Sequence, residues 1–230
     1  MNFLKTAAIV ILLSGLSTVI YAQERGFNIN NDEIFVYSNI FSDDSEEPGR
    51  TRYFAVPGDE SFFGYIHSDS RSEWRVYSDE KGFPTEISYS ASDNALFFEF
   101  DGSGNVRMHG VWDEKTVDIT KKFKNNVTLE NAAVVRTLDF DSGDKYVFDL
   151  LQTDKLPRLI AYRMYFKVLG TETVTVKAGT FRCRKILFTL TDWRTLFYKA
   201  YYYITDDDKR CIVKIDNVPE GGSSELISIE

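Results

Sequence analysis

The chain has 230 residues, of which 43% are hydrophobic and 15% aromatic, so it can bury one substantial core and a single domain is expected. Its 27 Lys and Arg residues against 35 Asp and Glu residues give a formal net charge of −8 at pH 7. This acidic balance argues against nucleic acids and anionic membrane surfaces as partners, because both are bound through clustered cationic side chains.

The first 22 residues have the composition of a secretory signal peptide. A basic Lys5 precedes an apolar run over residues 7–13, and the small residue Ala22 stands before the polar residues 23–25. We expect cleavage after Ala22, export to the periplasm or the extracellular medium, and one β-barrel-like domain over residues 23–230 with no transmembrane segment. A retained membrane anchor is the weaker alternative, because the apolar run is far shorter than the ~20 residues that span a bilayer.

Short strand-like runs separated by turn residues fill the first half of the mature chain. Residues 33–39 form the first expected strand, and the polar residues 42–49 form an exposed loop. Gly, Pro, Asn and Asp then punctuate the sequence at close intervals, as in Pro57-Gly58 and residues 101–105. This spacing predicts an antiparallel meander with strands at 51–56, 62–67, 73–77, 85–90, 96–100, 106–112 and 116–120.

The periodicity changes between the two halves of the chain. Residues 129–138 contain good helix formers, with Thr128 as the candidate N-cap, and predict one short helix. A buried strand is the competing interpretation of the same run. Strand patterns resume at residues 145–151 and 160–169.

Residues 160–217 predict a second meander, rich in Val, Ile, Tyr, Phe and Thr and interrupted at Gly170, Gly179 and Asp192. In the strand expected from Leu196 to Ile204, alternate side chains give one face that is entirely apolar or aromatic. No repeat or long linker divides the chain. The predicted fold class is therefore all-β with one short helix, built as an antiparallel meander.

Cys183 and Cys211 support two interpretations. An exported chain with two cysteines favours a disulfide. However, the strand expected at residues 196–204 would lie between the strands that carry them, and would place their Cα atoms roughly 10 Å apart at ~4.8 Å per strand. Two buried thiols are therefore favoured over the bond.

The sequence contains no recognisable catalytic set. His67 and His109 complete no ligand or catalytic motif and are expected to be ordinary residues of half-exposed strands. Neither a nucleophile elbow, a P-loop nor a zinc-protease motif occurs. Glu99 or Glu172 could face inward, but Glu172 is expected to fix a bend by accepting hydrogen bonds. No enzymatic activity, metal or cofactor is expected.

The run GTETVTVKAGTFRCRKI at residues 170–186 resembles a family of exported bacterial proteins known only as a domain of unknown function. The matching residues also include 206–210, and, more loosely, 75–89. Members of this family look like the half-open β-barrels of the LolA/LolB-type lipoprotein carriers. The resemblance implies a strongly curved antiparallel sheet around an apolar cavity, and it brings no catalytic residues.

Large rings are concentrated in the second meander and could either pack as a core or line a ligand cavity, of which core packing is favoured. The residues predicted as ligand-binding are Tyr162, Phe166, Phe188, Tyr198 and Tyr202. Together with the export signal and the resemblance, they predict a non-enzymatic envelope carrier of an apolar ligand such as a lipid or lipopeptide.

The alternative is a structural or interaction module that binds an envelope protein or a polysaccharide through its outer surface. Its contacts would come from strand edges and from exposed rings such as Trp74, Trp112 and Trp193.

Overall fold

The computed structural model describes residues 34–40, 46–55, 63–68, 72–79, 81–129, 131–218 and 222–230. The predicted signal peptide and its cleavage site lie outside these residues. Within the described part of the chain, no helix is long and apolar enough to cross a membrane.

The described strands form a single sheet in the order β8-β7-β6-β5-β4-β3-β2-β1-β15-β14-β13-β12-β11-β10-β9. Neighbouring strands are antiparallel except for β9 and β10, which are parallel. The first half contains β1 (Ile34–Ile40), β2 (Glu46–Ala55), β3 (Phe63–Ser68), β4 (Glu73–Ser78), β5 (Pro84–Ala91), β6 (Asn94–Phe100), β7 (Asn105–Trp112) and β8 (Lys115–Lys122). The second half contains β9 (Val127–Thr128), β10 (Lys145–Leu151), β11 (Ala161–Val176), β12 (Gly179–Leu190), β13 (Lys199–Thr205), β14 (Ile212–Asn217) and β15 (Gly222–Ile229).

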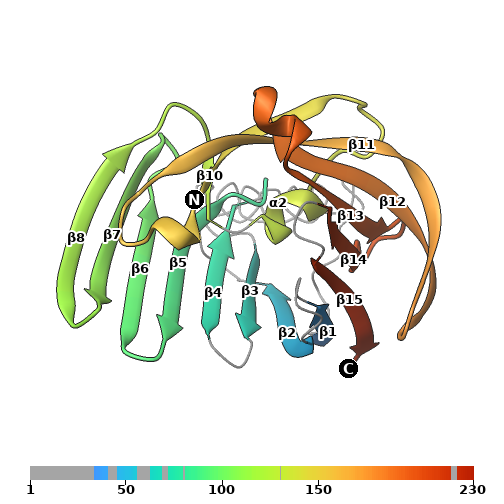
Figure 1. Ribbon diagram of the computed structural model, residues 1–230, viewed down its shortest axis with the longest axis horizontal. Coiled ribbons are helices and arrows are strands. Elements are labelled where there is room, and N and C mark those ends of the chain that lie inside the picture. The colour runs from blue at the N-terminus through green and yellow to red at the C-terminus, as the bar shows by residue number, and fades with distance from the viewer. Residues whose placement is uncertain are drawn as a thin grey trace, which may run out of the picture.

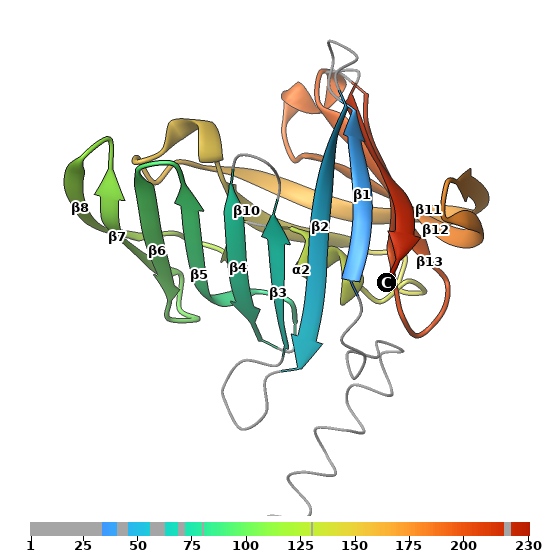
Figure 2. The ribbon, with the colours of Figure 1, turned by 90° about the horizontal axis from the view of Figure 1, so that it is seen from below.

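The sheet curves strongly but does not close, because β8 and β9 remain its two edges. Figure 1 shows β3 to β8 as one flank and β11 to β15 as the other, with the short helix α2 (Ala132–Arg136) between them. Seen from below, β1 and β2 stand where the two flanks meet (Figure 2). The predicted class, an all-β meander with one short helix forming a curved sheet or half-open barrel, is confirmed.

Alternation of apolar and polar residues explains why the first meander has one buried face. In β6, Leu96 and Phe98 are fully buried, whereas Phe97 between them is exposed. In β7, Val106 and Met108 are buried and Arg107 is exposed. A strand with a period of two can satisfy such a pattern only by turning one face to the core.

Several predicted boundaries were wrong. The polar run 42–49 is not all loop, because residues 46–49 begin β2 and pair with β1. Residues 160–169 and the run after Gly170 form one 16-residue strand, β11, whose register shifts between Val168 and Gly170. The strand expected from Leu196 begins only at Lys199, because residues 193–196 form the 3-10 helix η2 (Trp193–Leu196).

Other differences concern the helix and the C-terminus. The helix is shorter than predicted, and its N-cap is Asn131, which makes no side-chain capping bond, rather than Thr128. Thr128 instead belongs to β9. The last strand, β15, was not predicted at all, because its sequence GSSELISI begins with small polar residues.

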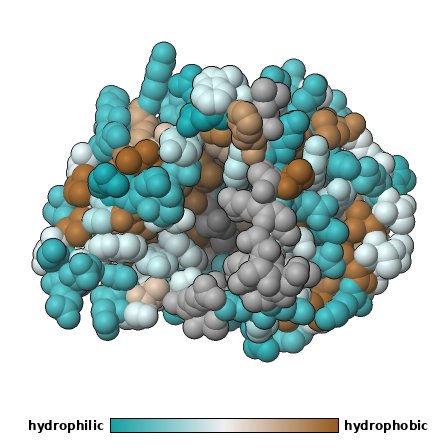
Figure 3. Space-filling model, viewed as in Figure 1, coloured by the Kyte–Doolittle hydropathy of each residue, from teal (hydrophilic) through white to brown (hydrophobic). Residues whose placement is uncertain are grey.

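The core consists of two clusters of buried side chains. One is built mainly on the first meander and the terminal strands, and includes Phe35, Ile87 and Phe98. The other lies between α2 and strands β10 to β14, and is dominated by stacked rings. On the face seen in Figure 3, hydrophilic residues cover much of the described surface.

Cys183 and Cys211 are both buried and free in the structure, which has no bond between them. As expected, a strand separates them: Cys183 lies on β12, Cys211 directly precedes β14, and β13 runs between. Burial, with smaller contributions from Asp207 and Asp206, raises the pKa of the Cys183 thiol to about 12. A thiol with so high a pKa is a poor nucleophile.

Candidate functional site

A cavity of about 370 Å³ opens on the concave face of the sheet, at the place where the two flanks meet. Its wall is formed by two rows of side chains that cross neighbouring strands. The volume of the cavity lies within the range of roughly 300–1,000 Å³ that is usual for small-molecule sites. The described lining residues are Tyr37, Asn39, Thr51, His67, Trp74, Leu129, Asn131, Ala132, Thr153, Tyr202, Ile212, Ile215 and Ser224.

The first row runs from β1 into the second meander. Asn39 pairs with Ser224 of β15, Ser224 with Ile215 of β14, and Ile215 with Tyr202 of β13. Directly paired residues point to the same face of a sheet, so all four side chains reach the same cavity. The row exists only because the first strand of the described chain lies beside the last.

The second row runs from β2 into the first meander. Thr51 pairs with His67 of β3, and His67 pairs with Trp74 of β4. Thr51 Oγ1 and His67 Nδ1 are 2.8 Å apart and hydrogen-bonded. The ring of Trp74 in turn packs on Tyr89 of β5, with ring centroids 4.2 Å apart. Beyond the polar pair, this row is therefore aromatic.

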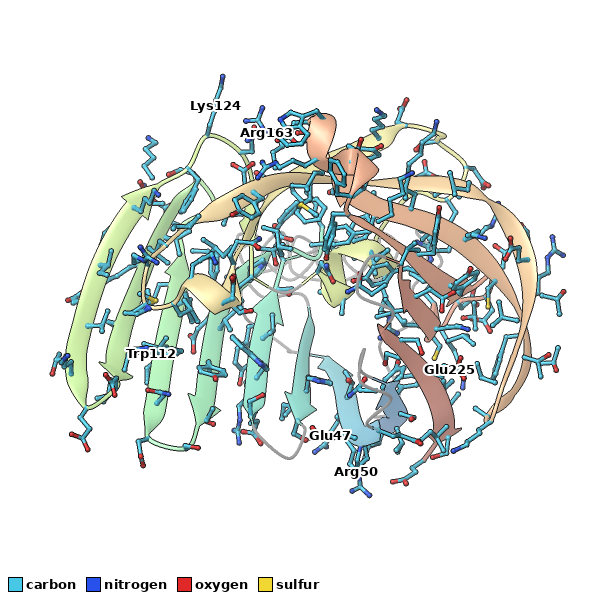
Figure 4. The ribbon with its side chains drawn as sticks, in the orientation of Figure 1. Glu47, Arg50, Trp112, Lys124, Arg163 and Glu225 are labelled. Atoms are coloured by element: carbon cyan, nitrogen blue, oxygen red, sulfur yellow. The ribbon has the colours of Figure 1, made fainter. Side chains whose placement is uncertain are left out.

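The two rows meet at Gly49 on β2, where the absence of a side chain lets Asn39 and His67 approach each other. A Cβ atom built on Gly49 would lie 2.7 Å from Asn39 Nδ2 and 3.2 Å from His67 Cε1. The next residue, Arg50, points to the outside of the sheet, as the alternation of a strand requires (Figure 4). Gly49 thus leaves room at the centre of the cavity wall.

Residues around α2 form the opposite wall of the cavity. Leu129, Asn131 and Ala132 lie there, together with Thr153 of η1 (Thr153–Lys155). The hydroxyl of Tyr202 donates to Asn131 Oδ1 at 2.8 Å, which ties this wall to the sheet. The cavity is therefore held on both sides by hydrogen-bonded side chains.

The buried Arg136 and the half-buried Arg210 hold α2 in place. Arg210 Nη1 donates to the carbonyl oxygens of Arg136, at 3.0 Å, and of Leu138. Arg136 Nη2 donates to the carbonyl oxygen of Lys209 at 2.6 Å. The Arg210 guanidinium also lies 4.1 Å from the ring centroid of Phe140, and burial lowers its pKa. These contacts satisfy carbonyl groups at and beyond the end of α2.

The residues predicted as ligand-binding fall mostly within the aromatic core. Phe166 and Phe188 are buried with ring centroids 5.0 Å apart, and Tyr202 contacts both edge-on. The ring of Tyr198 meets that of Phe188 edge-on, with centroids 6.0 Å apart. The guanidinium carbon of Arg194 lies 4.8 Å from the ring centroid of Tyr162. All five rings thus belong to or pack against one hydrophobic cluster, and Tyr202 is the one of the five that also lines the cavity.

Sequence reasoning missed most of the cavity wall. His67 was expected to be an ordinary strand residue, and it is half-buried but lines the cavity. Asn39, Thr51 and Ser224 were not considered. The alternation within each strand could have placed them on a concave face, but the approach of Ser224 to Asn39 depends on the pairing of β1 with β15.

The other candidate residues lie elsewhere. His109 lies on β7, outside the described cavity lining, and its ring stacks on that of Phe97 with centroids 5.5 Å apart. Glu99 does not face inward, because it is exposed and pairs with Arg107 at 3.3 Å. Glu172 lies within β11, two residues beyond the register shift that ends at Gly170, and its carboxylate accepts a hydrogen bond from Lys185 Nζ of β12 at 2.9 Å. Among the described residues, no group of three His, Cys, Asp or Glu side chains could hold a metal ion.

The three tryptophans do not share a surface. Trp74 and Trp112 are half-buried against the core, so the expectation that they are outer contacts was wrong. Trp193 is 72% exposed on η2, next to Phe197, which is 65% exposed. The two rings meet edge-on at 5.9 Å.

No protein-family model matches the chain, and no curated protein matches it. Its structure is similar to that of a β-barrel-like protein of the domain of unknown function DUF1849 from Brucella abortus, with a TM-score of 0.55 and 9% sequence identity. The match covers 86% of this chain and 96% of that one. This likeness agrees with the expected fold, that of an exported domain of unknown function, and shows the fold alone.

Two further solved structures align over most of their length. Lipoprotein LppX from Mycobacterium tuberculosis has a TM-score of 0.24 and 10% identity, covering 94% of this chain and 92% of that one. A domain described as an outer membrane lipoprotein-sorting protein, from Vibrio parahaemolyticus, has a TM-score of 0.27 and 12% identity, covering 91% and 90%. These TM-scores are too low to carry an inference.

Proposed function

We propose that this chain is a non-enzymatic binding or carrier protein of the bacterial envelope, which holds an apolar ligand such as a lipid or lipopeptide in the cavity of its half-barrel. The observation that carries the proposal is the cavity of about 370 Å³ on the concave face, with Trp74, Ile212 and Ile215 among its lining residues. Concave, largely preformed sites with apolar walls are typical of small-molecule binding.

Two features support a carrier over an enzyme. The lining places the Thr51 hydroxyl beside the His67 imidazole, but among the described lining residues there is no carboxylate to orient the imidazole as a catalytic base and no cysteine nucleophile. Cys183 is buried and its pKa is raised, which removes it as a nucleophile. Export, as the signal-like N-terminus predicts, would place such a carrier between membranes.

The proposal is tested by purifying the protein from the periplasm of a bacterium that expresses the full chain, followed by native mass spectrometry and lipid extraction. We expect a bound apolar molecule in a fixed ratio. Ala132→Phe, which adds a ring inside the cavity, should abolish the bound mass, whereas Val147→Phe, at an exposed position on β10, should retain it. A folded protein that is always empty, or a bound mass unaffected by Ala132→Phe, would contradict the proposal.

A second candidate function, an interaction module for an envelope protein, is favoured by the exposed rings on and beside η2. Trp193 and Phe197 present a projecting aromatic pair, and tryptophan is enriched among residues that dominate protein interfaces. Cross-linking in cells, compared with the Trp193→Ala variant, tests this function. A reproducible protein adduct that depends on Trp193, together with an empty cavity, would favour this function over the carrier.

A further inference from the structure

Four of the polar side chains that line the cavity lie on four central strands of the sheet. Asn39 and Ser224 are paired neighbours on β1 and β15, and Thr51 and His67 are paired neighbours on β2 and β3. These strands are consecutive in the sheet, in the order β3-β2-β1-β15. Because Gly49 has no side chain, Asn39 and His67 can lie close to each other there. The two pairs therefore form one polar patch, the central polar patch.

The central polar patch has hydrogen-bonding capacity that the protein itself leaves unused. Within the described chain, the side chains of Asn39 and Ser224 make no hydrogen bond, and His67 bonds Thr51 through Nδ1 alone. The Asn39 amide, the Ser224 hydroxyl and His67 Nε2 can therefore donate to or accept from a bound molecule. A polar group that is removed from water without a hydrogen-bond partner lowers the stability of the protein.

The cavity lacks a fixed charge that could hold an ionised group. None of the described lining residues is Lys, Arg, Asp or Glu. An ionised head group placed in this cavity would lose its hydration, and among the described lining residues only His67, when protonated, could pair with an anion, so binding of an ionised group is disfavoured. A neutral hydroxyl, ester or amide would instead match the donors and acceptors of the central polar patch.

Apolar side chains flank the central polar patch on both sides. Trp74 lies on β4 beyond His67, and Ile215 on β14 beyond Ser224, with Leu129 on the opposite wall. Building on the proposed carrier function, we infer that the ligand is a neutral amphipathic lipid. Its uncharged hydrogen-bonding group sits on the central polar patch, and its hydrocarbon lies against the apolar flanks.

The experiment compares three lipids that share one oleoyl chain: 1-monooleoylglycerol, oleate and 1-oleoyl-lysophosphatidate. Delipidated full-length protein is titrated below the micelle concentration of each lipid, and binding is read from displacement of the apolar dye N-phenyl-1-naphthylamine. We expect monooleoylglycerol to bind at least about tenfold more tightly than either anion, given the cost of an unpaired charge.

The outcomes separate the two proposals. If dye and lipids all fail to bind, the carrier function itself is wrong. If the two anions bind as tightly as monooleoylglycerol or more tightly, the carrier function stands but the neutral-ligand inference is overturned.

Variants locate the neutral group. Asn39→Leu keeps the side-chain size but removes its hydrogen-bonding groups, and should weaken monooleoylglycerol binding about tenfold while leaving dye binding unchanged. Asn126→Leu, at an exposed position outside the cavity lining, is the matched control and should change neither. If Asn39→Leu also loses the dye, the Ser224→Ala variant, which removes only a hydroxyl, replaces it. Unchanged monooleoylglycerol affinity in a dye-binding variant would overturn the assignment of the patch.

Discussion

At the scale of single residues, short polar side chains fix the turns that the meander needs. Asp101 accepts hydrogen bonds from the Asn105 side chain at 2.5 Å and from the backbone N–H groups of Ser103 and Asn105. These bonds close the connection between β6 and β7. Glu172, by contrast, makes an exposed ion pair with Lys185, and pairs of this kind contribute little to stability.

The Asp101 turn predicts a pH dependence of stability. Hydrogen bonds, first from the Asn105 side chain and then from the Ser103 backbone, lower the pKa of Asp101 from 3.8 to about 2. Because the pKa is depressed in the folded state, the stabilisation is fully present above pH ~4 and is lost as the pH falls through 2. Urea unfolding at several pH values should show Asp101→Asn less stable than the parent at pH 5, with the gap closing toward pH 2.

The control for this measurement is Asp144→Asn, which changes an exposed aspartate outside the turn. A gap between Asp101→Asn and the parent that stays constant down to pH 2 would contradict the assigned role of the Asp101 carboxylate.

At the scale of elements, close approach between strand backbones depends on glycine at one position in β7. Gly110 has φ +139°, and a Cβ atom there would lie 2.1 Å from the Ala95 carbonyl oxygen of β6. The obstructing atom is backbone in the middle of the first meander and cannot move aside as a flexible side chain could. Gly102, in the turn between β6 and β7, has φ +70° but open space around it.

We therefore expect Gly110→Ala to lower the free energy of unfolding by about 3 kcal/mol or more, since backbone strain and a steric clash add together. Gly102→Ala is the matched control and should cost only about 1–2 kcal/mol, from backbone strain alone. Chemical denaturation of the two variants measures both values. Equal losses would mean that β6 and β7 do not approach as closely as described.

At the scale of the whole molecule, the half-barrel separates a packed region from a hollow one. The rings of Phe148, Phe166 and Phe188 stack between α2 and the second meander and are fully or almost fully buried. The cavity lies beside this cluster, around the terminal strands, and shares the buried residues Tyr202 and Ile212 with it. None of these three stacked rings lines the cavity, so the packing of the second meander and the cavity wall rest on adjacent side chains.

This division predicts different effects of two substitutions. Phe166→Ala should lower the free energy of unfolding by about 3–5 kcal/mol, because it empties a fully packed site. His67→Ala should cost less than about 2 kcal/mol, since its side chain already borders open space. Urea denaturation followed by dye binding checks both. A Phe166→Ala protein that keeps its stability but loses the dye would show that the ring binds ligand instead of packing.

The sequence by itself determined the local features of this protein. Alternation of buried and exposed residues in β6 and β7, turn residues such as Asp101, and the ring-rich runs of β11 to β13 depend on neighbours a few positions away, so the all-β class and most strands could be predicted.

Only the tertiary structure decided where the cavity lies. The pairing of Asn39 with Ser224 joins strands at opposite ends of the chain, and no short-range pattern encodes which distant strands become neighbours. The pairings of β2 with β1 and with β3 bring His67, which in sequence resembles an ordinary strand residue, beside Asn39 across Gly49. The chemistry of the cavity wall therefore follows from the curvature and the order of the sheet, because these bring together side chains that the sequence keeps far apart.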